Sequence, residues 1–130
     1  MNDITPIPEK VSEQAPEKII ETPQIAYEDF AKLDIRIGTI MAVERVPETD
    51  KLLKCTIDFG TLGTRTIVSG IATWKTPEGL VGKQVPYIVN LATKVIRGVE
   101  SQGMLLAGTD ENGLVLLHPE HSTTPGIQLH

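Results

Sequence analysis

Apolar and polar residues alternate along several short stretches of this chain, which is the pattern of β-strands with one buried face. The clearest stretch covers residues 53–59, and its apolar members are Leu53, Cys55, Ile57 and Phe59. Weaker versions of the pattern predict further strands at residues 64–69, 85–89, 104–107 and 114–117. Turns that contain glycine are expected between neighbouring strands, at residues 60–63 and 110–113. The pattern therefore predicts an all-β domain.

The stretch from residue 33 to residue 46 changes its phase part of the way along. Apolar residues occupy every second position before Gly38, and a different spacing follows it. These apolar residues are Leu33, Ile35, Ile37, Ile40, Val43 and Val46. A long strand that changes phase at a glycine is typical of a coiled, bulged strand. We expect this strand to contribute to both halves of a closed barrel.

Two short helical turns are expected beside the strands. Tyr27, Phe30 and Leu33 supply an apolar face to one turn of helix, which we expect to plug one end of the barrel. Residues 71–82 read as a longer connection that holds a second turn. Pro86 lies within a predicted strand and requires an edge or bulge position, because proline has no backbone N–H.

These elements match a five-stranded Greek-key barrel of the oligonucleotide/oligosaccharide-binding (OB) fold, with a short N-terminal helical turn and a C-terminal extension. A small barrel or sandwich of another topology is the competing prediction, because strand number alone does not separate them. Residues 27–130 form the predicted domain, and from Pro119 onward they read as a polar extension. Residues 1–26 are acidic and rich in proline, which predicts a flexible tether.

Net charge limits the kind of partner that this domain binds. The chain has 12 basic and 17 acidic side chains, for a formal charge of −5. Two basic and five acidic side chains fall in residues 1–26, which leaves ten basic and twelve acidic ones in residues 27–130. A general nucleic-acid binder is usually basic. Any cationic surface on this near-neutral domain must therefore be local.

Several classes of protein lack support in the sequence. Cys55 is the only cysteine, so no intrachain disulfide forms, and a reducing cytoplasm suits the composition. No stretch is long and apolar enough to span a bilayer or to act as an export signal, so we expect a soluble, unexported protein. His118 and His121 are three residues apart, but Pro119 opposes the helix that a metal site would need. Without a glycine-rich phosphate loop, nucleophile elbow or carboxylate pair, we expect no catalysis and no cofactor.

Residues 90–106 carry the most suggestive chemistry. Lys94 and Arg97 are expected in a loop after one apolar strand, and Ser101 and Met104 at the entrance of the next. Such a loop offers cations for phosphates, a hydroxyl group for hydrogen bonds, and a thioether on which a base could lie. Two further aromatic residues are candidate stacking platforms, with burial as the alternative: Trp74 and Tyr87.

Several motifs occur together in a fixed order: Phe30 with Lys32, then Asp34, Arg36 and Gly38, then Asp50-Lys51-Leu52, Ile67-Val68-Ser69-Gly70, Asn90-Leu91 and Gly98-Val99-Glu100-Ser101-Gln102-Gly103-Met104. Together they resemble the tRNA-binding domain family. Its members occur at the C-terminus of bacterial methionyl-tRNA synthetases, as free-standing subunits, in structure-specific tRNA-binding proteins and in endothelial-monocyte-activating-polypeptide-like modules. The resemblance covers residues 27–130.

The resemblance implies an OB-fold homodimer that binds the outer corner of the L-shaped tRNA without catalysis. A methionyl-tRNA synthetase catalytic subunit is the further partner that it suggests. Because the chain begins with Met1 and lacks a synthetase core, we expect a free-standing accessory (beta) subunit or a structure-specific tRNA-binding protein. A piece cut from a longer synthetase would look the same. The alternative function is that of an export-related, chaperone-like dimer of the same fold, which binds polypeptide.

We expect seven residues to contact tRNA: Arg36, Lys51, Asn90, Lys94, Arg97, Ser101 and Met104. Ser101 and Met104 are included through the resemblance, and Arg97 because a guanidinium group both pairs and stacks. Several of them have a structural alternative. Lys51 could pair with Asp50, Arg36 could pair across strands with Asp58 or Glu44, Asn90 could cap its loop, and Met104 could fill the core.

Overall fold

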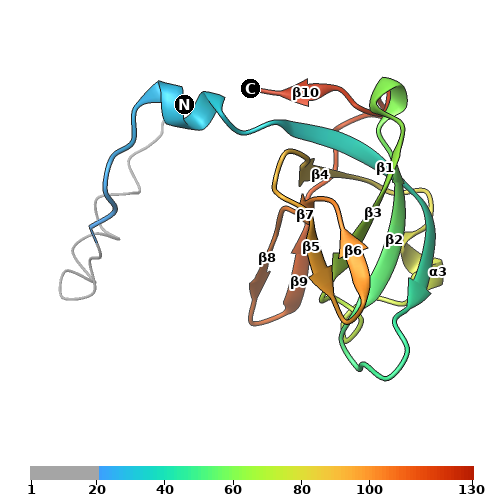
Figure 1. Ribbon diagram of the computed structural model, residues 1–130. Coiled ribbons are helices and arrows are strands. Elements are labelled where there is room, and N and C mark those ends of the chain that lie inside the picture. The colour runs from blue at the N-terminus through green and yellow to red at the C-terminus, as the bar shows by residue number, and fades with distance from the viewer. Residues whose placement is uncertain (1–20) are drawn as a thin grey trace, which may run out of the picture.

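The computed structural model describes residues 21–130, which form a barrel-like β-structure with few helical turns (Figure 1). The main sheet has the order β3-β2-β1-β4-β7, and β10 also pairs with β1. Its strands are β1 (Ile35–Arg45), β2 (Leu53–Asp58), β3 (Thr64–Ser69), β4 (Gln84–Ile88), β7 (Met104–Leu105) and β10 (Gln128–Leu129). Two hairpins are attached to it, β5 (Lys94–Ile96) with β6 (Val99–Ser101), and β8 (Ala107–Asp110) with β9 (Gly113–Leu116). The helical turns are α2 (Tyr27–Ala31), η2 (Gly60–Leu62) and α3 (Pro77–Leu80).

Strand β1 is shared between the two halves of the barrel. Its first part, Ile35 to Thr39, pairs with β4, and the part from Thr39 to Arg45 pairs with β2. The prediction of one long strand that serves both halves is confirmed. The register shift lies between Ile40 and Ala42, however, rather than at Gly38.

Gly38 is required for close packing inside the barrel. A Cβ atom at this position would lie 2.6 Å from Cε1 of Phe59 and closer still to Cγ2 of Ile57. Both neighbours are fully buried. Gly38 therefore lets β1 pass close over the buried side chains of Ile57 and Phe59.

The barrel closes where β3 meets the segment between β6 and β7. Gln102 N donates to Thr66 O (2.8 Å), and its side-chain Oε1 accepts from Thr66 N (3.0 Å). The hydroxyl of Ser101 accepts from Val68 N (2.9 Å). A glutamine and a serine side chain thus supply hydrogen bonds that a continuous strand ladder would otherwise make. The predicted OB-type barrel is confirmed, with β1–β4 and β7 as its five strands.

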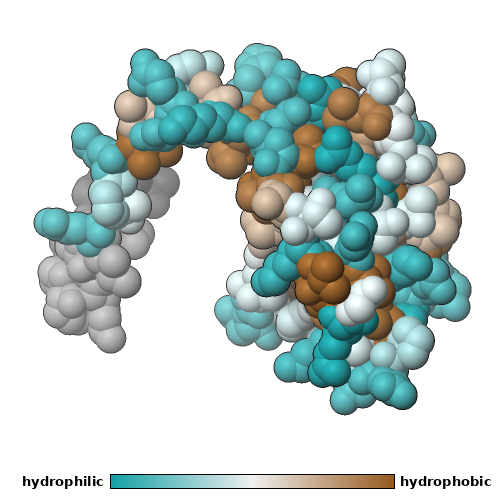
Figure 2. Space-filling view, viewed as in Figure 1, coloured by the Kyte–Doolittle hydropathy of each residue, from teal (hydrophilic) through white to brown (hydrophobic). Residues whose placement is uncertain are grey.

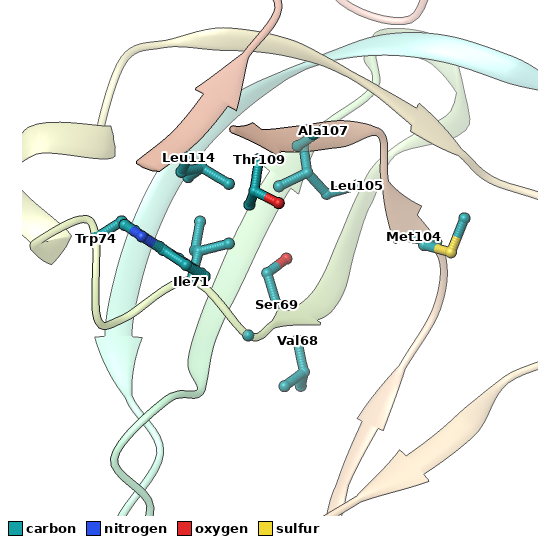
Figure 3. A pocket seen from close by; sticks show the side chains of 11 residues that line it. Val68, Ser69, Ile71, Trp74, Met104, Leu105, Ala107, Thr109 and Leu114 are labelled. Atoms are coloured by element: carbon teal, nitrogen blue, oxygen red, sulfur yellow. The ribbon is translucent and has the colours of Figure 1, made fainter. Parts of the chain in front are cut away.

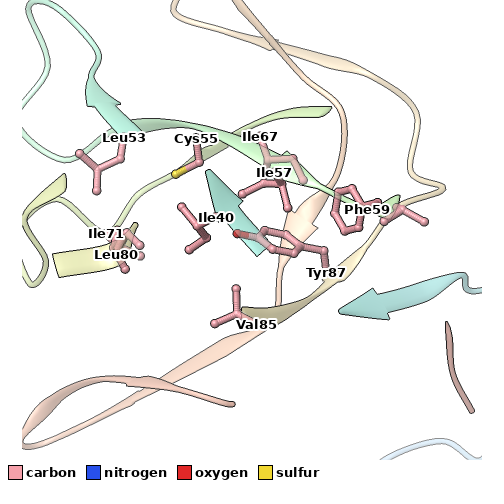
Figure 4. Packing of buried hydrophobic residues seen from close by; sticks show 11 residues of the cluster. Ile40, Leu53, Cys55, Ile57, Phe59, Ile67, Ile71, Leu80, Val85 and Tyr87 are labelled. Carbon is pink, nitrogen blue, oxygen red and sulfur yellow. The ribbon is translucent and has the colours of Figure 1, made fainter. Parts of the chain in front are cut away.

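The core consists of the apolar residues on the inner face of the barrel (Figure 4). They are Ile40, Leu53, Cys55, Ile57, Phe59, Ile67, Ile71, Leu80, Val85, Tyr87 and Val89. The rings of Phe59 and Tyr87 meet edge to face, with centroids 5.6 Å apart. Tyr87 is therefore a core residue and not a stacking platform. Burial raises the pKa of the Cys55 thiol to about 11, so it remains protonated at neutral pH.

Helix α2 does not plug the barrel as we predicted. It has no buried residue, Tyr27 is 72% exposed, and Figure 1 shows the helix outside the barrel, beyond the start of β1. The Asn90 side chain fixes this junction, since Nδ2 donates to Lys32 O (2.6 Å) and Oδ1 accepts from Asp34 N (2.9 Å). The junction therefore directs α2 away from the core.

The C-terminal segment is more ordered than the polar extension that we predicted. Its residues Gln128 and Leu129 form β10 against β1. The amide of Gln84 holds the segment earlier, since Nε2 donates to Thr123 O (2.7 Å) and Oε1 accepts from Thr123 N (3.0 Å). Polar residues anchor this segment through hydrogen bonds, which explains why its hydropathy pattern did not reveal a strand.

The position of Pro86 also differs from the prediction. Strand β4 lies inside the sheet, between β1 and β7, and Pro86 is opposite Ile37. The Pro86 carbonyl accepts from Leu106 N (3.0 Å), so its nitrogen faces the β7 side, where strand pairing starts only at Tyr87. The missing N–H therefore removes no bond to β1.

The predicted tether of residues 1–26 falls mostly outside the described residues and stays a prediction. Among residues 21–130, no helix has the length and apolar character needed to cross a membrane.

Candidate nucleic-acid interface

The segment that we read as a loop, residues 94–101, is a β-hairpin. Ile96 and Val99 are opposite each other, and Arg97 and Gly98 form the turn between them. Both turn residues have positive φ, 51° for Arg97 and 82° for Gly98, as in a type I′ turn. Glycine adopts this conformation without cost, whereas arginine rarely does. The hairpin therefore presents Arg97 at its tip, exposed to solvent.

Arg97 faces the loop between β1 and β2, where Lys51 lies. The two cations border one open cavity of about 410 Å³, which we call the Lys51–Arg97 corner. Its remaining lining residues are Glu48, Thr49, Asp50 and Leu52. Within residues 21–130 neither Lys51 nor Arg97 has a carboxylate within 4.0 Å, so the Lys51–Asp50 pair that we considered does not form. Both cations therefore remain available to an anionic ligand.

The carboxylates of Glu48 and Asp50 moderate the positive charge of this corner. With two cations and two carboxylates around one cavity, the local field is not strongly positive. The arrangement suits one or two phosphate groups at defined positions and not a long run of backbone. Figure 2 shows hydrophilic residues on the face with the β5–β6 hairpin, with separate apolar patches between them.

Lys94 and Met104 are also on the surface, but they do not line the Lys51–Arg97 corner. Lys94 begins β5 and is opposite Ser101, so it lies on the same hairpin as Arg97 but away from its tip. Met104 lies in β7 and is 45% exposed, so it is not the core residue of the alternative reading. It borders a different cavity from that of Arg97.

Three of the expected contact residues are engaged in holding the fold. The hydroxyl of Ser101 accepts from Val68 N and donates to Gly103 O (3.4 Å), and the residue is only 4% exposed. Asn90 anchors the junction of α2 and β1, as described above. Arg36 donates through Nε to Asp34 Oδ1 (2.8 Å) and through Nη1 to Gly126 O (3.0 Å). These hydrogen bonds leave the three side chains little freedom to contact a ligand.

Arg36 also lies far along β1 from the corner. It is in the first part of this 11-residue strand, whereas Lys51 follows the strand's end. The carboxylate partner of Arg36 is Asp34. The two cross-strand partners predicted from the sequence are engaged elsewhere, since Glu44 pairs with Lys54 (3.7 Å) and Asp58 Oδ1 accepts from Gly60 N. The structure therefore brings Lys51 and Arg97 together and separates Arg36 from them.

A second cavity, which we call the Trp74 pocket, lies where β3, β7 and the β8–β9 hairpin meet (Figure 3). Its volume is about 330 Å³, and it is lined by Val68, Ser69, Gly70, Ile71, Trp74, Met104, Leu105, Ala107, Gly108, Thr109 and Leu114. Leu52, which lines the corner, also approaches Gly70, and Ala72 N donates to Lys51 O (2.9 Å). The sequence singled out Trp74 and Met104 separately and did not predict that they share a pocket, because β3, β7 and the β8–β9 hairpin meet here only through the fold.

The histidines of the C-terminal segment show no metal-binding arrangement. His118 Nδ1 contacts Gln84 O (3.0 Å), and His121 Nδ1 contacts Ser122 O (2.9 Å). In the described part of the chain, no three His, Cys, Asp or Glu side chains gather closely enough to hold a metal ion.

The closed five-stranded barrel, with exposed cations beside an open cavity, defines a binding module of the OB class. The family described as "Putative tRNA binding domain" matches residues 35–128. The chain belongs to this tRNA-binding domain family.

The relatives include long proteins that are named as enzymes. The methionine–tRNA ligase of Porphyromonas gingivalis is 53% identical over 106 residues, which cover 81% of this chain and 15% of the relative. That of Methanococcoides burtonii is 49% identical over 107 residues, or 82% of this chain and 16% of the relative. The chain thus spans about a sixth of the length of these relatives.

Two similar crystal structures are of small proteins that the chain matches over their whole length. A MetRS-related protein from Pyrococcus horikoshii has a TM-score of 0.78 and 35% identity, with 84% of this chain and 100% of that chain covered. The chaperone CsaA from Bacillus anthracis has a TM-score of 0.75 and 32% identity, with 83% and 100% covered.

Proposed function

We propose that this chain is a non-catalytic tRNA-binding protein that recognises the outer corner of folded tRNA in the cytoplasm. It acts as an accessory to a methionyl-tRNA synthetase, as a free-standing beta subunit, as a structure-specific tRNA-binding protein or as one part of a longer synthetase. The observation that carries the proposal is a pair of cations, Lys51 and Arg97, which make no ion pair within residues 21–130 and border one cavity on a barrel of this family.

The corner sets the mode of binding. Two cations placed on a rigid barrel fit phosphates whose spacing is fixed by a folded RNA, so they recognise shape more than sequence. Such a contact adds to a synthetase's own hold on tRNA, because a second tethered site raises the effective concentration of the ligand. An accessory domain with modest affinity therefore improves tRNA capture without taking part in the reaction.

A gel-shift titration of mixed tRNA at two salt concentrations tests the proposal. We expect a dissociation constant that is micromolar or lower. The affinity is modest because the site makes few contacts. The logarithm of the binding constant should fall by only about 2 to 3 per tenfold rise in salt, since few phosphates are neutralised. Failure of tRNA to form a complex at low salt would contradict the proposal.

The second candidate is polypeptide binding by a chaperone-like dimer. The structural likeness to the chaperone CsaA favours it, as does the partly apolar Trp74 pocket. An unfolded polypeptide is therefore included in the titration as a competitor. Binding of that polypeptide, together with failure of tRNA to bind, would support the chaperone function instead.

We also propose that the chain forms a homodimer. Exposed apolar side chains occur on the two segments next to the start of β1, the α2 segment that precedes it and the C-terminal segment that pairs with it: Ile25, Tyr27, Leu33, Ile127 and Leu129. Exposed apolar groups of this kind mark interaction surfaces. Light scattering of the purified protein should therefore give twice the chain mass of 14.2 kDa. A single-chain mass at micromolar concentration would exclude the dimer.

A further inference from the structure

We propose that the Trp74 pocket binds one unpaired nucleobase of the RNA, which stacks on the Trp74 indole and hydrogen-bonds to the Ser69 hydroxyl. The inference rests on the proposed tRNA binding and adds a second subsite to it. The Trp74 pocket recognises a base, whereas the Lys51–Arg97 corner recognises phosphates.

Trp74 is held as a platform and not left as a mobile surface side chain. Its backbone is fixed by two hydrogen bonds, since Trp74 N and Lys75 N both donate to Ile71 O (3.0 Å each). Its ring rests against the turn of the β8–β9 hairpin, where a Cβ on Gly113 would lie 3.2 Å from Cδ1 of the indole. The side chain is nevertheless 49% exposed. An aromatic ring fixed in this way loses little entropy when a base stacks on it.

Ser69 supplies the second, independent indication of a ligand. The residue is only 9% exposed, and its hydroxyl makes no hydrogen bond with any group in residues 21–130. The pocket is the open side of this residue, so a partner for the hydroxyl comes from there, and the polar groups of buried side chains are nearly always hydrogen-bonded. In Figure 3 the Ser69 oxygen points across the pocket toward the hydroxyl of Thr109. A ligand with a hydrogen-bonding edge would satisfy it.

The rest of the lining matches a flat, partly apolar ligand. Ile71, Leu105 and Leu114 form apolar walls, and the thioether of Met104 lies at the rim (Figure 3). Sulfur makes favourable contacts with aromatic rings. The volume of about 330 Å³ is at the lower end of the range for small-ligand sites, which suits a single base. Platform, hydroxyl and apolar wall are together the contacts by which proteins hold splayed-out bases.

The position of the pocket favours a nucleotide over an apolar peptide side chain. Leu52 lies between the pocket and the Lys51–Arg97 corner, so the two cavities adjoin. The ribose-phosphate of a base in the pocket would therefore leave it on the side of Lys51 and Arg97, which make no ion pair within residues 21–130. A peptide side chain gains nothing from that charge, whereas a phosphate does.

Tryptophan fluorescence tests the proposal directly, because Trp74 is the only tryptophan of the chain. Mixed tRNA should quench the emission, with the same midpoint as the gel-shift complex. A short single-stranded RNA should quench it too, whereas an abasic oligomer of equal charge should not. Equal quenching by the abasic oligomer would overturn base stacking.

Two variants measure the contribution of the pocket. Trp74→Ala should weaken tRNA binding roughly 5- to 100-fold, and Trp74→Phe should retain most of the affinity, because stacking on an aromatic ring is what is lost. Ser69→Ala should weaken binding roughly 2- to 10-fold without lowering the melting temperature, since that hydroxyl has no hydrogen-bond partner among residues 21–130. The matched control is Met41→Ala, which truncates a 53% exposed side chain outside the pocket and should bind as the parent does.

The outcomes separate this inference from the function on which it rests. Normal tRNA binding by Trp74→Ala, with unchanged fluorescence in the parent complex, would remove the base subsite and leave tRNA binding intact. Absence of any tRNA complex would remove both. Quenching by an unfolded polypeptide that displaces tRNA would show that the pocket takes apolar peptide side chains instead.

Discussion

The double variant Lys51→Ala/Arg97→Ala is expected to bind tRNA roughly 30- to 100-fold more weakly than the parent, at unchanged melting temperature. Each cation contributes a charge-assisted contact to a phosphate, and because both side chains are exposed to solvent, each contact is worth only about 1 to 1.4 kcal/mol. Neither side chain makes an ion pair or hydrogen bond within residues 21–130, so the fold does not depend on them. Gel-shift titration and thermal unfolding of the same preparations measure the two effects.

The control for this variant is Lys32→Ala/Lys83→Ala, which removes the same charge from positions outside the corner. It should bind tRNA nearly as the parent does, because exposed charges act mainly at short range in physiological salt. The salt dependence should also become shallower by about 2 in the corner variant, one unit for each lost phosphate contact. Equal weakening in both variants would show that net charge, and not the corner, determines binding.

Replacing Gly38 by alanine should destabilise the fold by roughly 3 kcal/mol, because the added methyl group overpacks the core. It would overlap the side chains of Ile57 and Phe59, which are fully buried in the core. This loss is a large part of the total stability of a typical domain. Urea unfolding followed by circular dichroism measures the change as a lower midpoint at constant slope.

Gly108→Ala is the matched control, since a Cβ at Gly108 meets no atom within 4 Å. This substitution should leave the unfolding midpoint unchanged or raise it slightly, because alanine restricts the unfolded chain. A Gly38→Ala protein as stable as the Gly108→Ala protein would mean that β1 can move away from β2 at little cost. The barrel would then be more adaptable than its packing indicates.

The alternation of residues predicted the central strands well. Strands β2 and β3 begin and end within one residue of the expected positions, because one face of each is buried and the period of two is clear. The β5–β6 hairpin was read as a loop because its strands have three residues each. A type I′ turn needs a positive φ at both central residues, and only Gly98 is a residue that favours it. The sequence Arg97-Gly98 therefore did not predict the turn.

Long-range contacts explain what the sequence did not predict. The apolar face of residues 27–33 predicted that a helical turn would pack against another surface, but it did not predict which one. In the structure α2 lies outside the barrel. The roles of Arg36 and Asn90 depend on partners 90 and 58 residues away, which no local pattern reveals. For the candidate site, the resemblance indicated Lys51 and Arg97, whereas the Trp74 pocket required three separate segments to be brought together by the fold.

The pairing of β10 with the first residues of β1 has a consequence for how this barrel combines with other proteins. Entry into the barrel through α2 and exit through β10 occur side by side, at the end of β1 that is remote from Lys51. A polypeptide fused at either side would therefore emerge from the same place and leave the opposite corner unobstructed. The barrel can therefore be joined to a larger protein without blocking the Lys51–Arg97 corner.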